Sequence, residues 1–159
     1  MSVSLPHPEP PKRFSGPHVL VVEDDRASAV LIRAVTLRHV PGASVTVVND
    51  GQAAIDYLSR VPPYRSTELY PHPDLIILDI GLPILTGFGV LEWMADHPET
   101  LTVPVVVFSG SGDKDDAVRA YALGARAYLP KSTNPTELAA VIAKVMQRWS
   151  VQSRDGTSG

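Results

Sequence analysis

At 159 residues the chain is long enough for one domain with a hydrophobic core, and its 44% hydrophobic and 19% charged residues are ordinary for a globular protein. Its net charge of −3 comes without a basic stripe, which disfavours nucleic acid and membrane surfaces as partners. The absence of cysteine excludes disulfides and thiol chemistry and predicts a cytoplasmic location. No apolar run approaches the roughly 18 residues that a membrane span needs.

The two ends of the chain differ in composition from its middle. Residues 1–17 hold five of the 15 prolines, which predicts a disordered arm and argues against a signal peptide. Residues 151–159 are polar and predict a flexible tail. The folded domain is therefore expected over residues 18–150.

Five apolar segments predict β-strands. The segments 18–22, 74–78 and 103–108 are continuous and rich in Val, Ile and Leu, as in strands that are covered on both faces. The segment 44–48 partly alternates with polar residues, and 126–130 ends in a proline that cannot donate to a central ladder. These last two segments are expected at the sheet edges.

Between the strands, apolar residues recur at the spacing of helices. Three such stripes are Ala27, Val30, Leu31, Ala34 and Leu37; Ala54, Tyr57, Leu58 and Val61; and Leu138, Val141, Ile142, Val145 and Trp149. Asn134 before Pro135 predicts a helix start, and Gly124 predicts a helix end. The alternation of strands and helices predicts an α/β fold: a doubly wound, five-stranded parallel sheet of flavodoxin-like order 2-1-3-4-5, with helices on both faces.

One connection in this pattern is unusually long. The second helix is expected to end near Val61, which leaves residues 62–73 (PPYRSTELYPHP) as a loop before the third strand. Loops of this length without a role are uncommon, but a simple surface insertion is the favoured interpretation.

Polar side chains follow the ends of four predicted strands. Glu23 and Asp24 follow the first strand, and Asp79, Ser109 and Lys131 end the third, fourth and fifth. The carboxyl ends of parallel strands meet at one edge of a sheet, where ligands of such folds bind. Any one of these residues alone is more often a turn or surface residue, but together they predict a site.

Their chemistry suits phosphoryl transfer. Three carboxylates this close repel each other and require a cation, for which Mg²⁺ (or Mn²⁺) fits, with the Gly81 carbonyl as a further ligand. Asp79 is the natural acceptor, because carboxylates form acyl phosphates. Ser109 and Lys131 supply the hydroxyl and the ammonium that an incoming phosphoryl group needs. No glycine-rich dinucleotide or P-loop motif is present, and the histidines lack metal-ligand spacing.

These residues resemble the receiver domain of two-component response regulators over about 18–150. Glu23 and Asp24 form the family's acidic pair. Asp79 is followed by Pro83 and Gly87, and Ser109 by a small residue, at the family's spacing. Tyr128 stands at the aromatic switch position, three residues before Lys131.

The resemblance implies a single-domain response regulator in a phosphorelay, a phosphoacceptor rather than an enzyme. A sensor histidine kinase would phosphorylate Asp79, with Lys131 pairing with Asp79 or the phosphoryl group and with Glu23, Asp24, Asp79 and Gly81 holding the metal. Ser109 and Tyr128 would then switch position, and the output would be protein–protein contact.

Small stand-alone receivers paired with phytochrome-type kinases are the most similar subfamily, which implies a possible homodimer through the fourth helix, fifth strand and fifth helix. The sequence departs from the family at two positions. Ser132 replaces the usual proline after Lys131, so either a strained cis Lys131–Ser132 bond or a rearranged loop is expected. Thr86 replaces an acid before Gly87.

Two other functions remain open. A receiver-like scaffold could act without phosphate, although the intact acidic pair and Lys131 argue against it. A phosphatase of the haloacid dehalogenase type would need a second aspartate where Gly81 stands.

Overall fold

The computed structural model describes residues 16–156, with side chains described up to residue 147. The strands are β1 (His18–Val22), β2 (Ser44–Val48), β3 (Leu75–Leu78), β4 (Val105–Ser109) and β5 (Ala127–Pro130). The helices are α1 (Arg26–His39), α2 (Gly51–Ser59), α3 (Gly87–Ala95), α4 (Lys114–Ala122) and α5 (Pro135–Gly156), with a 3-10 turn, η1 (Pro98–Thr100). Strands and helices alternate as predicted.

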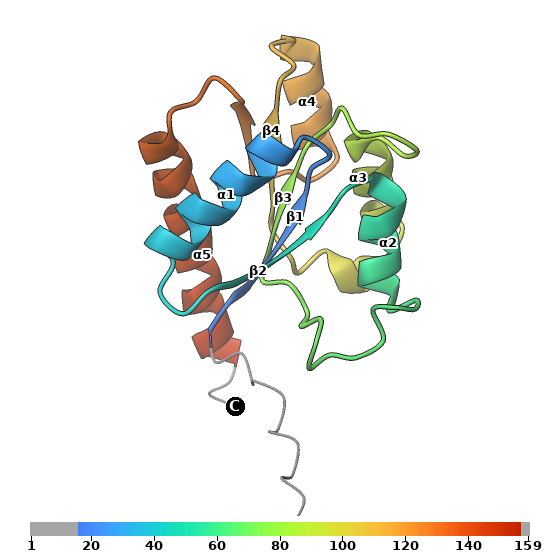
Figure 1. Ribbon diagram of the computed structural model, residues 1–159, viewed down its shortest axis with the longest axis vertical. Helices are drawn as coiled ribbons and strands as arrows, with labels where there is room; N and C mark the ends of the chain where they lie inside the picture. Colours follow the sequence, from blue (N-terminus) through green and yellow to red (C-terminus); the bar gives the residue numbers. More distant parts are fainter. Residues whose placement is uncertain (1–15, 157–159) are drawn as a thin grey trace, which may run out of the picture.

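The strands form one all-parallel sheet in the order β2-β1-β3-β4-β5. The predicted fold is confirmed, and β2 and β5 lie at the two edges. Figure 1 shows α1 and α5 on one face of the sheet, with α2 and α3 on the other. This three-layer arrangement buries β1 and β3 on both sides, which explains their continuous apolar runs.

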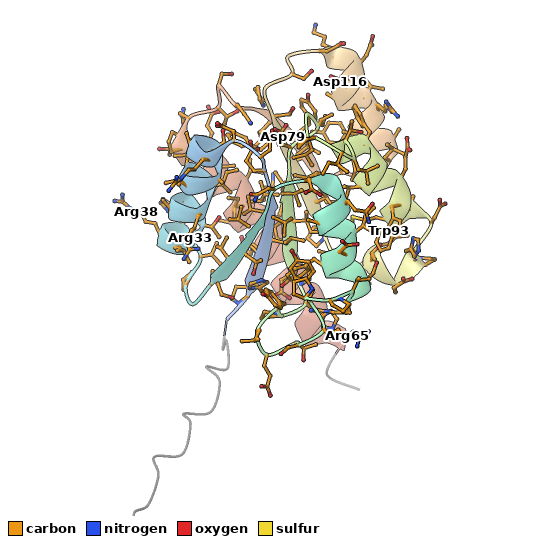
Figure 2. The ribbon with its side chains drawn as sticks, turned by 45° about the vertical axis from the view of Figure 1, so that its right-hand side comes forward. Arg33, Arg38, Arg65, Asp79, Trp93 and Asp116 are labelled. Carbon is orange, nitrogen blue, oxygen red and sulfur yellow. The ribbon has the colours of Figure 1, made fainter. Side chains whose placement is uncertain are left out.

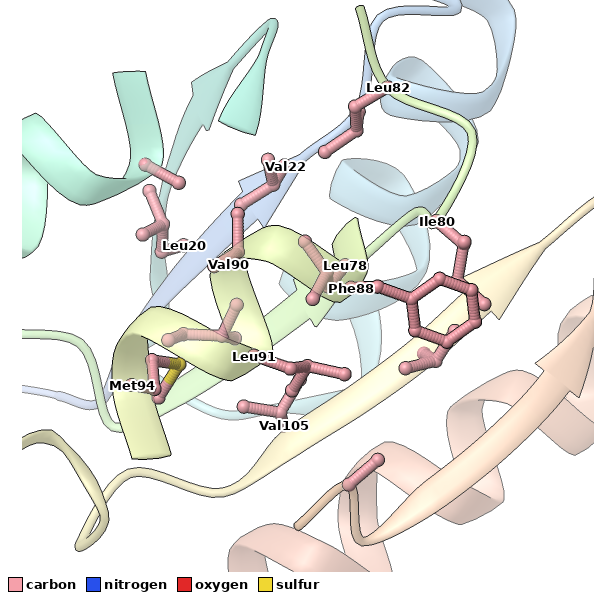
Figure 3. Packing of buried hydrophobic residues seen from close by; sticks show 14 of the residues in the cluster. Leu20, Val22, Leu78, Ile80, Leu82, Phe88, Val90, Leu91, Met94 and Val105 are labelled. Carbon is pink, nitrogen blue, oxygen red and sulfur yellow. The ribbon is translucent and has the colours of Figure 1, made fainter. Parts of the chain in front are cut away.

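Alternate residues of each strand pack into two separate hydrophobic cores, one on each face of the sheet. Leu20 and Leu78 face α2 and α3, where they pack with Leu91 and Met94 (Figure 3). Val21 and its neighbours of the opposite set pack under α1 and α5. The two cores hold the strands in fixed register, so the residues that follow the strands are placed by the sheet.

Side-chain caps begin the helices. Asn134 Oδ1 accepts from the Glu137 backbone amide at 2.8 Å, which confirms the predicted start of α5. Asp25 caps α1, and Thr86 caps α3 by accepting from the Gly89 amide at 3.3 Å. Thr86 therefore keeps a capping function although it is not an acid. Gly124 follows α4 with φ +106°, as expected of a helix-ending glycine.

The apolar stripe that predicts α1 is not the face that this helix buries. Its residues are all exposed, among them Val30 (60%) and Leu37 (44%). The buried side chains are instead Ile32, Val35 and Thr36. The helix is thus apolar on two sides. Its inner face packs on the sheet, and the stripe that contains Val30 faces outward.

The long loop before β3 lies at the amino-terminal ends of the strands. α2 ends at Ser59, two residues earlier than expected. Tyr70 packs edge-on against Tyr64 and Tyr57, and Tyr64 packs tilted against Tyr57 of α2, with ring centroids 5.0–6.0 Å apart. Arg60 donates to the carbonyl oxygens of Tyr64 and Tyr70. The loop is therefore pinned to the domain through its aromatic residues.

Several predictions concern the chain ends or the Lys131 junction. Residues 1–15 of the predicted arm lie outside the described residues, as do residues 157–159 and the side chain of Trp149. Residues 151–156, assigned above to the tail, continue α5. Within residues 16–156, Pro62–Pro63 is the recorded cis peptide bond, so Lys131–Ser132 is trans. No helix in this range is long and apolar enough to cross a membrane.

Candidate functional site

Neighbouring strand ends bring the predicted carboxylates together. The Glu23 amide donates to the Val48 carbonyl oxygen at 3.0 Å, and the Asp79 amide donates to the Val22 carbonyl oxygen at 3.0 Å. These bonds extend the ladders of β1 and β3 by one residue, so Glu23 and Asp79 are positioned by the sheet. Figure 2 shows Asp79 at the carboxyl-terminal end of the strands. Glu23 is 1% exposed and Asp79 is 5% exposed.

Lys131 connects the two carboxylates across the site. Its Nζ donates to Glu23 Oε1 at 2.8 Å and to Asp79 Oδ2 at 3.1 Å. The Gly81 amide donates to the other oxygen, Asp79 Oδ1, at 3.1 Å. Both oxygens of Asp79 are therefore engaged, and its side chain is held in one orientation. Lys131 makes these contacts although its peptide bond to Ser132 is trans.

The three carboxylates form a group that fits a cation. One oxygen each of Glu23, Asp24 and Asp79 lies within 4.8 Å of the others. Glu23 Oε2 is buried and has no hydrogen-bond partner among the described residues. A buried carboxylate oxygen without a donor is costly, and a hard cation would satisfy it. The donor set therefore fits Mg²⁺ or Mn²⁺.

The electrostatics of the site agree with this geometry. Burial raises the pKa of the Glu23 carboxyl above its usual value although Lys131 opposes the shift, and the Asp79 carboxylate adds to it. Burial alone would lower the pKa of Lys131, but its hydrogen bonds to Glu23 and Asp79 hold that pKa above its ordinary value. Lys131 is thus an ammonium at neutral pH, and one ammonium leaves the cluster with uncompensated negative charge.

Ser109 and Tyr128 lie on the next strands of the same edge. Ser109 ends β4, is 2% exposed, and accepts from the Ser111 amide through its hydroxyl at 3.4 Å. The Tyr128 hydroxyl, from β5, donates to the Ser111 carbonyl oxygen at 2.9 Å. Both predicted switch residues therefore contact Ser111, in the loop that leads into α4. The Ser111 hydroxyl in turn donates to Asp116 of α4 at 2.5 Å.

Two glycines near Asp79 differ in what the structure demands. A Cβ at Gly87 would lie 2.3 Å from the Asp79 carbonyl oxygen, so only glycine lets α3 begin this close to the site. A Cβ at Gly81 would lie 3.9 Å from Asp79 Oδ1, an ordinary contact. Packing therefore does not require glycine at 81, and its carbonyl as a metal ligand stays a prediction.

Some neighbours of the site could not be found from sequence patterns. Asp116 and Arg33 are ordinary helix residues in the sequence, and the fold brings them to the site. A depression of about 450 Å³ beside Glu23 and Asp24 is lined by Arg26, Arg33 and Val30 of α1. Two arginines therefore line the same depression as Glu23 and Asp24.

A flavodoxin-like sheet that carries clustered carboxylates and a lysine at its carboxyl edge defines a receiver-type α/β domain. The family model of the response regulator receiver domain matches residues 19–143. The chain belongs to this family. As a general property, receiver domains accept a phosphoryl group from a kinase on an aspartate, without being enzymes in the ordinary sense, and bind Mg²⁺ or Mn²⁺ in an acidic pocket.

Relatives with known names agree. Response regulator Rcp1 from Synechocystis sp. is 31% identical over 131 residues, which are 82% of this chain and 87% of Rcp1. The transcriptional regulatory protein CpxR from Escherichia coli is 32% identical over 89% of this chain, but the match spans only 55% of CpxR.

Solved structures match at similar levels. The phosphorylated cyanobacterial phytochrome response regulator RcpA has a TM-score of 0.71 at 32% identity, covering 85% of this chain and 94% of RcpA. The Mn²⁺-bound form of Rcp1 has a TM-score of 0.70 at 32% identity, covering 84% and 94%. Homologues of this kind imply a sensor histidine kinase as partner.

Proposed function

We propose that this chain is a single-domain phosphoacceptor that takes a phosphoryl group on Asp79 from a sensor histidine kinase in a phosphorelay and signals by protein–protein contact. The observation that carries this is the orientation of the Asp79 carboxylate, which Gly81 and Lys131 hold from two sides. A carboxylate that is preset in this way is ready for in-line attack.

In the transfer, an oxygen of Asp79 attacks the phosphorus of a phosphohistidine. The P–O bond forms as the P–N bond breaks, and the electron pair stays on the imidazole nitrogen, which takes up a proton. Lys131 and Ser109 stabilise the transferred group, Lys131 by charge and Ser109 by its hydroxyl. A cation held by Glu23, Asp24, Asp79 and the Gly81 carbonyl would neutralise phosphoryl oxygens.

The output runs through Ser109 and Tyr128. When Ser109 turns toward the phosphoryl group, it gives up its bond with the Ser111 amide, and the Tyr128 bond to the Ser111 carbonyl oxygen is strained with it. Tyr121 of α4 also accepts from the Tyr128 amide at 3.1 Å. Both tyrosines therefore connect β5 to α4 and to the loop before it, which supports α4 and β5 as parts of the proposed output face of α4, β5 and α5.

That face is suited to protein contact, including a homodimer. Val118 is 67% exposed and Tyr121 is 51% exposed, both on α4. Exposed apolar side chains of this size are typical of interaction surfaces when they cluster. A phytochrome-type sensor kinase is the proposed phosphodonor, because RcpA and the bacteriophytochrome response regulator RtBRR, which is 30% identical, are named for that association.

Incubation with acetyl phosphate and Mg²⁺ tests the assignment of Asp79. Intact-mass measurement should show one added phosphoryl group on the wild type and none on Asp79→Asn. Asp24→Asn should slow the reaction strongly, whereas Asp96→Asn, at an exposed aspartate after α3, should not. Incorporation into Asp79→Asn would refute the assignment. Partner affinity that is unchanged by phosphorylation would favour the phosphate-independent scaffold, and turnover of small phosphate esters would favour a phosphatase.

A further inference from the structure

The loop from β3 to α3 holds one residue whose backbone and side chain both conflict with its surroundings. Ile84 has φ +68°, in the left-handed region. A β-branched side chain clashes with its own backbone there, and glycine or asparagine is the usual occupant. The side chain is also 83% exposed, the largest exposure of any bulky apolar residue described.

Packing on both sides of Ile84 imposes this backbone conformation. Ile80 and Leu82, earlier in the loop, are buried at 7% and 6% exposure. Leu85, directly after it, is fixed by two close approaches: a Cβ at Gly51 would lie 2.2 Å from the Leu85 carbonyl oxygen, and one at Gly89 would lie 2.6 Å from its side chain. The loop is therefore anchored around Ile84, and the isoleucine itself contributes no core packing.

We infer that Ile84 is an apolar anchor for the phosphohistidine-bearing surface of the sensor kinase, a specificity residue retained at a cost in stability. This inference rests on the proposed function. Strained residues that the surrounding structure over-determines cluster at functional sites. Here the strain lies five residues after Asp79, on the rim of the site.

The geometry of phosphoryl transfer identifies the partner that Ile84 contacts. Asp79 is only 5% exposed, so a donor nitrogen must enter a recess to come within about 3–3.5 Å of its reacting partner. A small phosphodonor can do this without touching the rim. A protein donor cannot, because its surface must press on the loops around the recess, including residues 80–86. Val30, beside Glu23 and Asp24, offers a second exposed apolar side chain to the same surface.

Two variants separate this role from a structural one. Ile84→Asn and Ile84→Gly both suit a left-handed backbone, so each should raise the melting temperature by about 2–4 °C. Phosphorylation by acetyl phosphate should keep its wild-type rate. Transfer from a kinase should lose about tenfold in kcat/KM, mainly through KM, because burial of an isoleucine is lost. Leu69→Asn, at a 64% exposed leucine near the opposite edge, is the matched control and should change neither rate.

The kinase is the autophosphorylated phytochrome-type histidine kinase that transfers fastest to the wild type in a panel of such kinases. Unchanged transfer to both Ile84 variants would overturn the inference, as would an equal loss in Leu69→Asn. Melting temperatures that fall in both variants would show that Ile84 supports the fold, with the same consequence. A panel without any transfer, or acetyl phosphate labelling of Asp79→Asn, refutes the proposed function instead.

Discussion

The amino-terminal ends of the strands (the amino edge) and their carboxyl-terminal ends (the carboxyl edge) hold buried polar groups in opposite ways. At the amino edge the His18 ring is 3% exposed, with Nδ1 2.6 Å from Ser44 Oγ and Nε2 2.9 Å from Thr46 Oγ1. At the carboxyl edge Glu23 is as deeply buried, but one of its oxygens has no partner among the described residues. Figure 2 places Asp79 and Arg65 at these opposite ends.

The difference teaches where this fold keeps its reactive chemistry. Neutral hydrogen bonds at the amino edge link His18 of β1 to β2. The Tyr57 hydroxyl, 3.1 Å from His18 Nε2, donates to the Pro71 carbonyl oxygen at 2.6 Å and so ties the loop before β3 to the domain. Carboxylates at the carboxyl edge keep excess charge that a ligand can compensate. The first arrangement stabilises the folded chain by itself, and the second does so only when something binds.

Acid should therefore weaken the protein first at the amino edge, which is the largest effect we expect. Burial, and next the Arg60 charge, lower the pKa of His18 from 6.5 to about 4. Between these pH values the unfolded chain binds a proton that the native state refuses, so the free energy of unfolding falls as the pH falls. The full loss is about 3 kcal/mol, since each pKa unit corresponds to about 1.4 kcal/mol.

Urea unfolding of the wild type and His18→Gln at pH 7, 6, 5 and 4 measures this loss. The variant should show a flatter dependence on pH, whereas His39→Gln, at the exposed end of α1, should follow the wild type. The pKa of Glu23 is raised rather than lowered, so its contribution has the opposite sign: it is present at low pH and is lost as the pH rises through the folded-state pKa. Parallel curves for wild type and His18→Gln would contradict the prediction.

Divalent metal should stabilise the carboxyl edge alone. At a Mg²⁺ concentration 100 times its Kd, the free energy of unfolding should rise by about 2.7 kcal/mol, because only the native state gathers the three carboxylates. Thermal melts with and without Mg²⁺ measure this gain. Asp24→Asn should lose most of it and Asp96→Asn should keep it. An equal gain in both variants would locate the metal elsewhere.

Crowding near Asp79 should make a side chain at position 87 destabilising, by less than the stabilisation expected from Mg²⁺. Gly87→Ala puts a Cβ 2.3 Å from the Asp79 carbonyl oxygen, and the shift needed to relieve this should cost about 2 kcal/mol despite the better helix propensity of alanine. Gly112→Ala, where nothing lies within 4 Å of the added Cβ, is the control and should stay within about 0.5 kcal/mol of wild type. Urea unfolding compares them, and equal stabilities would refute the crowding.

The two edges were not equally predictable from the sequence. The gathering of side chains at the carboxyl edge could be predicted because Glu23, Asp79 and Ser109 directly follow apolar runs, and parallel strands bring such positions together. The amino edge could not, because Tyr64 and Tyr70 meet Tyr57 only after the loop folds back, and no period or motif encodes that. The trans bond after Lys131 was also open, since the sequence shows only that a proline is missing.

Helix α1 shows why periodicity identifies a helix better than it identifies the buried face, and it gives the smallest predicted effect. Val30→Ala should change the free energy of unfolding by less than about 0.5 kcal/mol, because Val30 is 60% exposed in the apolar stripe that predicts the helix. Val35→Ala, at 6% exposure outside that stripe, should cost about 2 kcal/mol through lost burial and a cavity. Urea unfolding of both variants gives the comparison. Equal losses would mean that the outer stripe is covered in solution, for instance by self-association, which a dependence of the unfolding midpoint on protein concentration would reveal. If Val30→Ala leaves the free energy of unfolding unchanged, the wild-type Val30 side chain is uncovered beside Glu23 and Asp24, where a partner that approaches Asp79 would meet it.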